Sequence, residues 1–142
     1  MQNAVQTICV IVPTYNEERT IGNCIESIRT VTRGYPIELI IVDNGSTDLT
    51  REIAEALGAK VIVDSSRHVS GLRNLGASQT NAEILAFVDA DCIVAADWVE
   101  NAQHYFDKSD VSVWGSPPTH PKPGTWVQRA WDLVRRKRNQ VQ

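Results

Sequence analysis

The chain has 142 residues, of which 42% are hydrophobic and 22% charged, and this balance predicts a globular domain rather than a disordered chain. Its net charge of −3 combines an acidic body with a basic end. Residues 1–120 carry 8 Lys and Arg against 16 Asp and Glu, whereas residues 121–142 carry 6 against 1. The acidic body argues against nucleic acid as the main partner.

The three cysteines, Cys9, Cys24 and Cys92, have neither the spacing of a zinc site nor that of a disulfide framework. Free thiols are typical of a reducing compartment, so we expect a cytoplasmic protein. The first residues lack the pattern of a signal peptide, and no apolar run approaches the ~20 residues that a membrane span requires.

The first half of the chain alternates apolar runs with amphipathic segments. Residues 7–12 are almost all apolar and β-branched and predict a buried strand. Asn16 is expected to cap the next helix, whose apolar residues recur at helical spacing over 21–28. A second strand is predicted over 37–42 and a second helix over 49–57.

The second half continues this pattern. It predicts a strand over 60–63, a helix beginning at Ser70, a strand over 84–88 buried on both faces, a helix over 97–106 and a strand over 111–114. Strands that alternate with helices predict the doubly wound α/β class, with a mostly parallel sheet and helices on both faces.

The last part of the chain has a different composition. We expect an α/β domain over 1–116, followed over 117–142 by a proline-rich loop and a basic helix with tryptophans on its apolar side. Such a helix, over 126–141, either makes peripheral contact with a membrane surface or packs on protein.

Polar clusters follow three of the predicted strands, at 14–17, at 43–48 and at Asp89 and Asp91. The carboxyl ends of parallel strands share one edge of a sheet, so the clusters are expected to converge on one ligand site. If the backbone stays extended through Asp91, the two aspartates point the same way. A positive group should then offset their repulsion. The alternative is an ordinary polar strand end.

The sequence has no glycine-rich phosphate loop, which favours a cation as the group that neutralises a phosphate-bearing ligand. Carboxylates such as Asp89 and Asp91 suit Mg²⁺ or Mn²⁺. Asp43 either accepts hydrogen bonds from a base or ribose, or bonds its own turn. Arg73 either reaches a phosphate or base, or is a solvated helix cation.

Four segments in this order, 10–17, 40–48, 71–76 and 87–91, resemble family 2 glycosyltransferases. The resemblance covers roughly residues 7–95 and implies the GT-A fold, that of nucleotide-diphospho-sugar transferases. It also implies transfer of a sugar, with inversion, from a nucleotide diphosphate sugar to an acceptor, and UDP-sugars are the commonest donors.

The resemblance further implies which residues bind the donor. Asp43 would contact the base, and Asp89 and Asp91 would contact the ribose, the metal and the diphosphate. The implied nucleotide-sugar-binding residues are Pro13, Thr14, Tyr15, Glu17, Asp43, Asn44, Gly45, Ser46, Asp48, Arg73, Asp89, Ala90 and Asp91.

The sequence departs from the family pattern in one respect. No Glu-Asp pair follows a Gly-Gly-Phe-like segment, so we place no catalytic base in this chain and expect a truncated chain or fragment. It is then either a transferase or a binding module without transfer activity. Phosphotransferases of the haloacid dehalogenase type also use Asp-x-Asp, but typically after the first strand and before Gly-Thr, whereas here Cys92 and Ile93 follow.

Overall fold

The structure is a computed structural model that describes residues 6–106 and 113–115. The chain divides into two compact units, Met1–Lys108 and Ser109–Gln142, and the fold below is that of the first. The predicted helix over 126–141 lies outside the described residues, and the predicted boundary after residue 116 stays a prediction.

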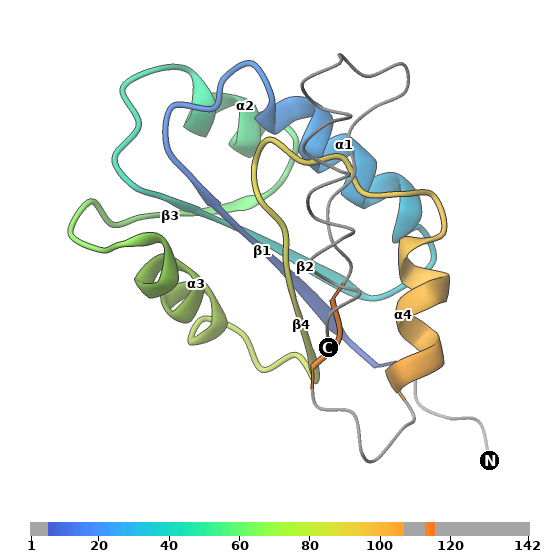
Figure 1. Cartoon of the computed structure of the whole chain (residues 1–142). Helices are drawn as coiled ribbons and strands as arrows, with labels where there is room; N and C mark the ends of the chain where they lie inside the picture. Colours follow the sequence, from blue (N-terminus) through green and yellow to red (C-terminus); the bar gives the residue numbers. More distant parts are fainter. Residues whose placement is uncertain (1–5, 107–112, 116–142) are drawn as a thin grey trace, which may run out of the picture. The chain divides into compact units, whose positions relative to one another are not determined.

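Strands and helices alternate along the described chain (Figure 1). In chain order the elements are β1 (Ile8–Thr14), α1 (Ile21–Val31), β2 (Ile37–Asp43), α2 (Thr50–Ala56), β3 (Lys60–Val63), α3 (Val69–Ala77), β4 (Ile84–Phe87) and α4 (Trp98–Phe106). The four strands form one parallel sheet in the order β3-β2-β1-β4. The α/β class is therefore confirmed.

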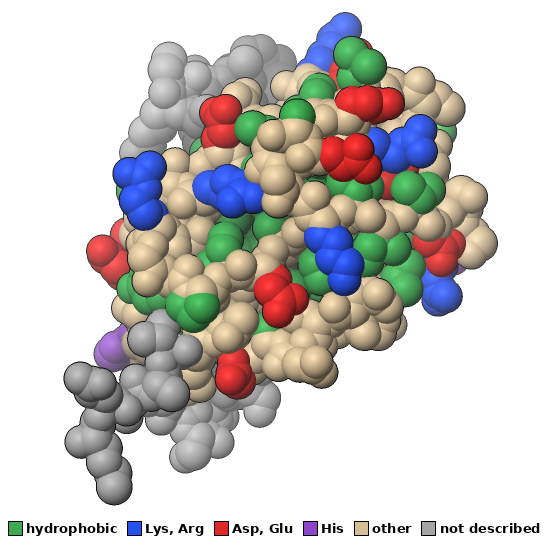
Figure 2. All heavy atoms as spheres, turned by 180° about the vertical axis from the view of Figure 1, so that it is seen from behind, with side chains coloured by type: hydrophobic (Ala, Val, Ile, Leu, Met, Phe, Trp, Pro, Cys, Tyr) green, Lys and Arg blue, Asp and Glu red, His purple; other side chains and the backbone are tan. Residues whose placement is uncertain are grey.

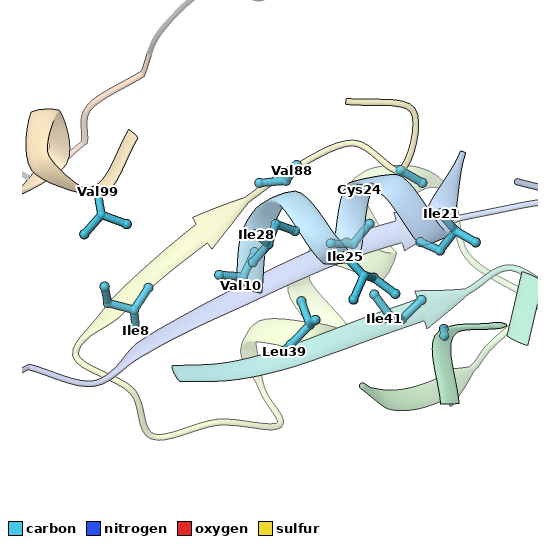
Figure 3. Packing of buried hydrophobic residues seen from close by; sticks show 13 residues of the cluster. Ile8, Val10, Ile21, Cys24, Ile25, Ile28, Leu39, Ile41, Val88 and Val99 are labelled. Carbon is cyan, nitrogen blue, oxygen red and sulfur yellow. The ribbon is translucent and has the colours of Figure 1, made fainter. Parts of the chain in front are cut away.

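Strand β1 is buried along its whole length because helices cover both faces of the sheet. On one face, Val10 packs with the apolar side of α1 (Figure 3). Val12 and residues of α2 and α4 belong to the same cluster. On the other face, Cys9 and Ile11 pack with Leu72 of α3. This arrangement fixes the ends of β1 and β2 side by side, with Thr14 opposite Asp43 in the register.

Gly76 allows α3 to lie close to the sheet. A Cβ atom at this position would lie 2.5 Å from Ile11 Cγ2 and 3.1 Å from Val42 Cγ2, both within the core. Only a residue without a side chain fits this approach. The close packing holds the amino-terminal half of α3, with Leu72 and Arg73, beside the carboxyl ends of the strands.

The prediction that the fourth strand is buried on both faces is wrong. In β4, Leu85 is 42% exposed and Phe87 is 48% exposed. Within the described part of the chain, β4 pairs only with β1, and α3 covers β1 and β2 instead. Among the described residues, this apolar run therefore lies at an edge of the sheet.

Two predicted helix starts are also wrong. Helix α1 begins at Ile21 with Thr20 as its N-cap, because Asn16 bonds to another loop, and α3 begins at Val69 rather than after Ser70. Of the strand predicted over 111–114, the described residues 113 and 114 are not in a strand. In the described ranges, no helix is both long and apolar enough to cross a membrane.

Candidate functional site

A cleft of about 450 Å³ opens at the carboxyl ends of β1, β2 and β4, beside the first turns of α3. This is the edge at which open α/β sheets bind ligands. Its lining residues are Pro13, Thr14, Tyr15, Glu17, Asn44, Val69, Leu72, Arg73, Asp89, Ala90 and Asp91. Nine of the thirteen predicted residues are thus brought together.

The remaining four predicted residues, Asp43, Gly45, Ser46 and Asp48, do not line the cleft. Conversely, the sequence analysis missed Val69 and Leu72, which add apolar surface to it. Leu72 lies within the segment that carries Arg73, but its apolar side chain indicated only core packing.

Asp43 is fully buried, and its carboxylate closes its own turn. The carboxylate accepts hydrogen bonds from Gly45 N–H at 3.0 Å and from Ser46 N–H at 2.8 Å, and also from the Ser46 hydroxyl. The structure therefore shows the turn-forming bonds of Asp43, and its contact with a base stays a prediction.

Asp48 forms a similar set of bonds at the start of α2. Its carboxylate accepts from the Thr50 hydroxyl at 2.5 Å, from Thr50 N–H at 3.0 Å and from Glu18 N–H at 3.1 Å. Desolvation raises the pKa of Asp48, but these hydrogen bonds to its charged form outweigh it and leave the pKa below its ordinary value.

Two buried polar atoms in residues that line the cleft have no hydrogen-bond partner within the described structure. They are Thr14 Oγ1 and Asn44 Oδ1. The two residues lie on adjacent strand ends, where Asn44 N–H donates to the Thr14 carbonyl at 2.9 Å. Because an unsatisfied buried polar atom costs about 1–3 kcal/mol, these atoms mark where a ligand with polar groups would be stabilised.

Arg73 and Asp89 both line the cleft and form an ion pair. Arg73 Nη2 lies 2.6 Å from Asp89 Oδ1, and the two side chains are 32% and 59% exposed. The guanidinium therefore provides the positive charge that the acidic pair was expected to need. Because both partners are in contact with solvent, the ion pair itself contributes about 0–1 kcal/mol to stability.

The backbone does not stay extended through Asp91, so the condition for the two aspartates to point the same way as alternate residues of one strand is not met. Strand β4 ends at Phe87, and the Asp89 carbonyl accepts Cys92 N–H at 3.0 Å to close a turn. Val88 and Ala90 are nevertheless buried between exposed neighbours, and both aspartates line the cleft.

The turn that carries the aspartates is in contact with Cys24, a buried residue of α1. The Cys24 thiol donates to the Asp89 carbonyl at 3.6 Å. Burial, with the neighbouring Cys92 and the two aspartates, raises the pKa of Cys24 to about 12, so the thiol keeps its proton. This contact holds the turn against the core.

The described residues contain no group of three or more His, Cys, Asp or Glu side chains placed to hold a metal. Three carboxylates line the cleft, those of Glu17, Asp89 and Asp91, and the two aspartates lie one residue apart on the same turn. A Mg²⁺ or Mn²⁺ ion fits such a pair when phosphate oxygens and water complete its coordination, as is usual for Mg²⁺.

Comparison with known proteins identifies the family. The profile described as "Glycosyl transferase family 2" matches residues 9–142. The chain belongs to this family. It is 32% identical to the glycosyltransferase AglE of Haloferax volcanii over 140 residues, which cover 91% of the chain and 45% of that relative. It is 37% identical to glucosyl-3-phosphoglycerate synthase of Mycolicibacterium smegmatis, over 63% of the chain and 32% of the relative.

Two solved structures of the family resemble the chain closely enough to compare. Glucosyl-3-phosphoglycerate synthase from Mycobacterium tuberculosis, in complex with Mn²⁺, UDP and glucosyl-3-phosphoglycerate, gives a TM-score of 0.57 at 34% identity, over 67% of this chain and 37% of that one. TarS (1–349) from S. aureus, in complex with UDP-GlcNAc, gives a TM-score of 0.63 at 27% identity. The match covers 80% of this chain and 37% of TarS (1–349). The chain therefore spans less than half of each relative, and the GT-A fold is shared.

Proposed function

We propose that the chain forms the donor-binding part of a glycosyltransferase that transfers a sugar from a nucleotide diphosphate sugar to an acceptor, with inversion. One observation carries this proposal. The cleft unites three strand ends of the family segments, and its lining includes an acidic pair and two residues, Thr14 and Asn44, that each have a buried polar atom without a partner. One similar structure is a complex with UDP and Mn²⁺ and another a complex with UDP-GlcNAc, which supports a UDP-sugar donor and a divalent cation.

The two ends of the cleft suit different parts of such a donor. Thr14 and Asn44 offer a hydroxyl and a carboxamide, which would bond to the polar edge of the base or to the ribose. Tyr15, 56% exposed, offers an aromatic face beside them. Asp89 and Asp91, at the other strand end, would hold the cation that binds the diphosphate.

In an inverting transfer, an acceptor hydroxyl attacks the anomeric carbon while the bond from that carbon to the diphosphate breaks. The diphosphate leaves with the bonding electron pair. A divalent cation, when bound, stabilises this developing charge as a Lewis acid. Arg73 and the two aspartates would hold the diphosphate end of the donor in place. The hydroxyl proton passes to a base that we do not assign to this chain.

Calorimetric titration tests the proposal. The chain is titrated with UDP and with GDP, each with and without Mn²⁺. We expect binding of a nucleotide diphosphate that strengthens when Mn²⁺ is present, with UDP preferred. If no nucleotide diphosphate binds in a metal-dependent manner, the proposal is wrong.

A second candidate function follows from the length of the chain, which spans less than half of its relatives. In this case the chain binds the donor but does not catalyse transfer by itself. The two functions are separated by incubation with a radiolabelled UDP-sugar and Mn²⁺. Release of labelled sugar, to water or to an acceptor, would exclude the pure binding module.

The basic stretch 126–141 supports a separate proposal, peripheral contact with the inner face of a membrane. Its tryptophans and its surplus of Lys and Arg suit an anionic lipid surface. In contrast, on the face of the molecule drawn in Figure 2 acidic and basic side chains are interspersed. Co-sedimentation with phosphatidylglycerol vesicles, compared with phosphatidylcholine vesicles, tests this proposal, and equal binding to both would contradict the electrostatic part.

A further inference from the structure

The loop between β1 and α1 is held in place by side chains from the loop that follows β2. Three successive backbone N–H groups of the first loop donate to side-chain oxygens of the second. These bonds run from Asn16 N to Ser46 Oγ at 2.8 Å, from Glu17 N to Thr50 Oγ1 at 2.8 Å and from Glu18 N to Asp48 Oδ2 at 3.1 Å. The first loop thus depends on its neighbour for its conformation.

Asn16 is the point at which the first loop changes direction. Its φ of 53° is the only positive value among the non-glycine residues that the structure describes. Asparagine tolerates this left-handed conformation better than most residues do. Its Oδ1 accepts Thr47 N–H at 2.9 Å, which ties the strained residue to the second loop. The flanking residues Tyr15 and Glu17 both line the cleft.

Two carboxylates orient the hydroxyls that receive these N–H groups. The Ser46 hydroxyl donates to Asp43, and the Thr50 hydroxyl donates to Asp48 at 2.5 Å. An ionised carboxylate can only accept, so each hydroxyl must direct its proton toward it. The lone pairs of each hydroxyl oxygen are then free to accept from the first loop. Without its carboxylate, each hydroxyl would rotate.

We infer that four residues between the end of β2 and the start of α2, here called the loop clamp, are positioning residues for the donor site. The loop clamp consists of Asp43, Ser46, Asp48 and Thr50. It does not line the cleft but fixes the backbone that presents Tyr15 and Glu17 to it. The inference rests on the proposed function. It gives a positioning role to three residues, Asp43, Ser46 and Asp48, that the family resemblance implies as ligand-binding residues.

Thr50 provides the sharpest test, because it is fully buried and its hydroxyl bonds both Glu17 N–H and Asp48. Thr50→Val keeps the shape of the side chain but removes the hydroxyl, whereas Thr50→Ser keeps the hydroxyl and loses a methyl group. Both variants are measured as full-length chains for thermal stability, for exchange of the Glu17 amide by NMR, and for UDP affinity with Mn²⁺ by calorimetry.

We expect Thr50→Val to accelerate Glu17 amide exchange and to weaken UDP binding, each by about tenfold, because it leaves a backbone N–H without its partner. Thr50→Ser should keep UDP affinity within about twofold, since its hydroxyl still accepts that bond. Ile28→Val, which removes a methyl group from the core under α1, controls for destabilisation alone. It should lower thermal stability but leave the affinity of the folded protein unchanged.

Asn16 variants test the same inference in the loop between β1 and α1, which the loop clamp holds. Asn16→Gly permits the left-handed backbone, whereas Asn16→Ala opposes it, and both lose the bond to Thr47. UDP affinity should therefore fall further in Asn16→Ala than in Asn16→Gly.

The possible failures are distinguishable. Unchanged UDP affinity in folded Thr50→Val, or an equal loss in Thr50→Ser, would overturn the inference while the proposed function stands. If the wild-type chain binds no nucleotide diphosphate, the proposed function fails instead. In that case the Glu17 amide still decides whether the clamp exists, because unaltered exchange in Thr50→Val contradicts it independently of any ligand.

Discussion

The two ends of the cleft are built in different ways. At the ends of β1 and β2, two loops are joined by a dense set of hydrogen bonds, and the carboxylate of Asp43 is fully buried. At the end of β4, Asp89 and Asp91 lie on an exposed turn, where a single ion pair to Arg73 spans the cleft. The side chains of the first end are preorganised, whereas at the second end the backbone turn is anchored but the exposed side chains of Asp89, Asp91 and Arg73 can rearrange at little cost.

This difference matches what each end would bind. A base has fixed donors and acceptors and is recognised best by groups that are already in place. A diphosphate with its cation brings its own strong charges, so exposed carboxylates and a long guanidinium can adjust around it. The predictions below test this contrast, beginning with the largest expected effect.

Gly76→Ala should disturb the base of the cleft most, because its Cβ would lie 2.5 Å from Ile11 Cγ2 in the core. We expect a loss of about 1–3 kcal/mol in the free energy of unfolding, measured by urea denaturation. The matched control is Gly22→Ala in α1, whose Cβ would make an ordinary contact of 3.6 Å with Ile53. This variant should be neutral or gain up to ~1 kcal/mol from helix propensity. Equal effects of both substitutions would contradict the close packing of α3.

Asp91→Ala tests the adaptable end. Because Asp91 is exposed and lies at the mouth of the cleft, its removal should leave the fold intact but abolish the gain in UDP affinity that Mn²⁺ provides. The measurement is the same titration with and without Mn²⁺, together with thermal unfolding. Glu55→Ala, on the exposed surface of α2, serves as the control for loss of one negative charge. Retained metal dependence in Asp91→Ala would show that the ion binds elsewhere.

Arg73→Ala should weaken UDP binding less than Asp91→Ala weakens the Mn²⁺-dependent part of it. It should change UDP affinity but have little effect on stability. The ion pair with Asp89 is partly exposed, so unfolding free energy should change by less than about 1 kcal/mol. UDP affinity should fall several-fold, because a cation beside the diphosphate site is lost. Arg73→Lys keeps the charge and should recover part of the affinity. If affinity is unchanged, Arg73 is only a partner of Asp89.

Protonation of Asp64 should have the smallest effect, and this effect should be on stability rather than on binding. Asp64 lies in the loop after β3 and does not line the cleft. Hydrogen bonds from Ser66 and Arg67 lower the pKa of its carboxyl from 3.8 to about 2. The charged form is thus favoured in the folded chain, so this stabilisation is fully present above pH ~4 and is lost as the pH falls through the folded pKa. An NMR titration that places the pKa of Asp64 near 4 would contradict these contacts.

Much of the fold could be predicted because it depends on local pattern. Apolar runs of strand length alternated with amphipathic helices, and this alternation permits few arrangements other than a parallel sheet covered on both faces. The same rule brought the ends of three strands to one edge. The exposure of β4 could not be predicted, because an apolar run does not show whether a neighbouring element covers it.

What the sequence by itself determined was the family, the class of fold and the edge of the sheet at which ligands would gather. Only the tertiary structure decided which residues face the cleft. Asp43 and Asn44 are adjacent at the end of β2, yet Asp43 is buried in its turn whereas Asn44 lines the cleft. The physical reason is that the direction of a side chain at a strand end depends on the bonds of the following turn. For Asp43 those bonds are local, to Gly45 and Ser46, but the turn and the start of α2 also bond to a loop some thirty residues away, and that contact comes from folding rather than from residue type.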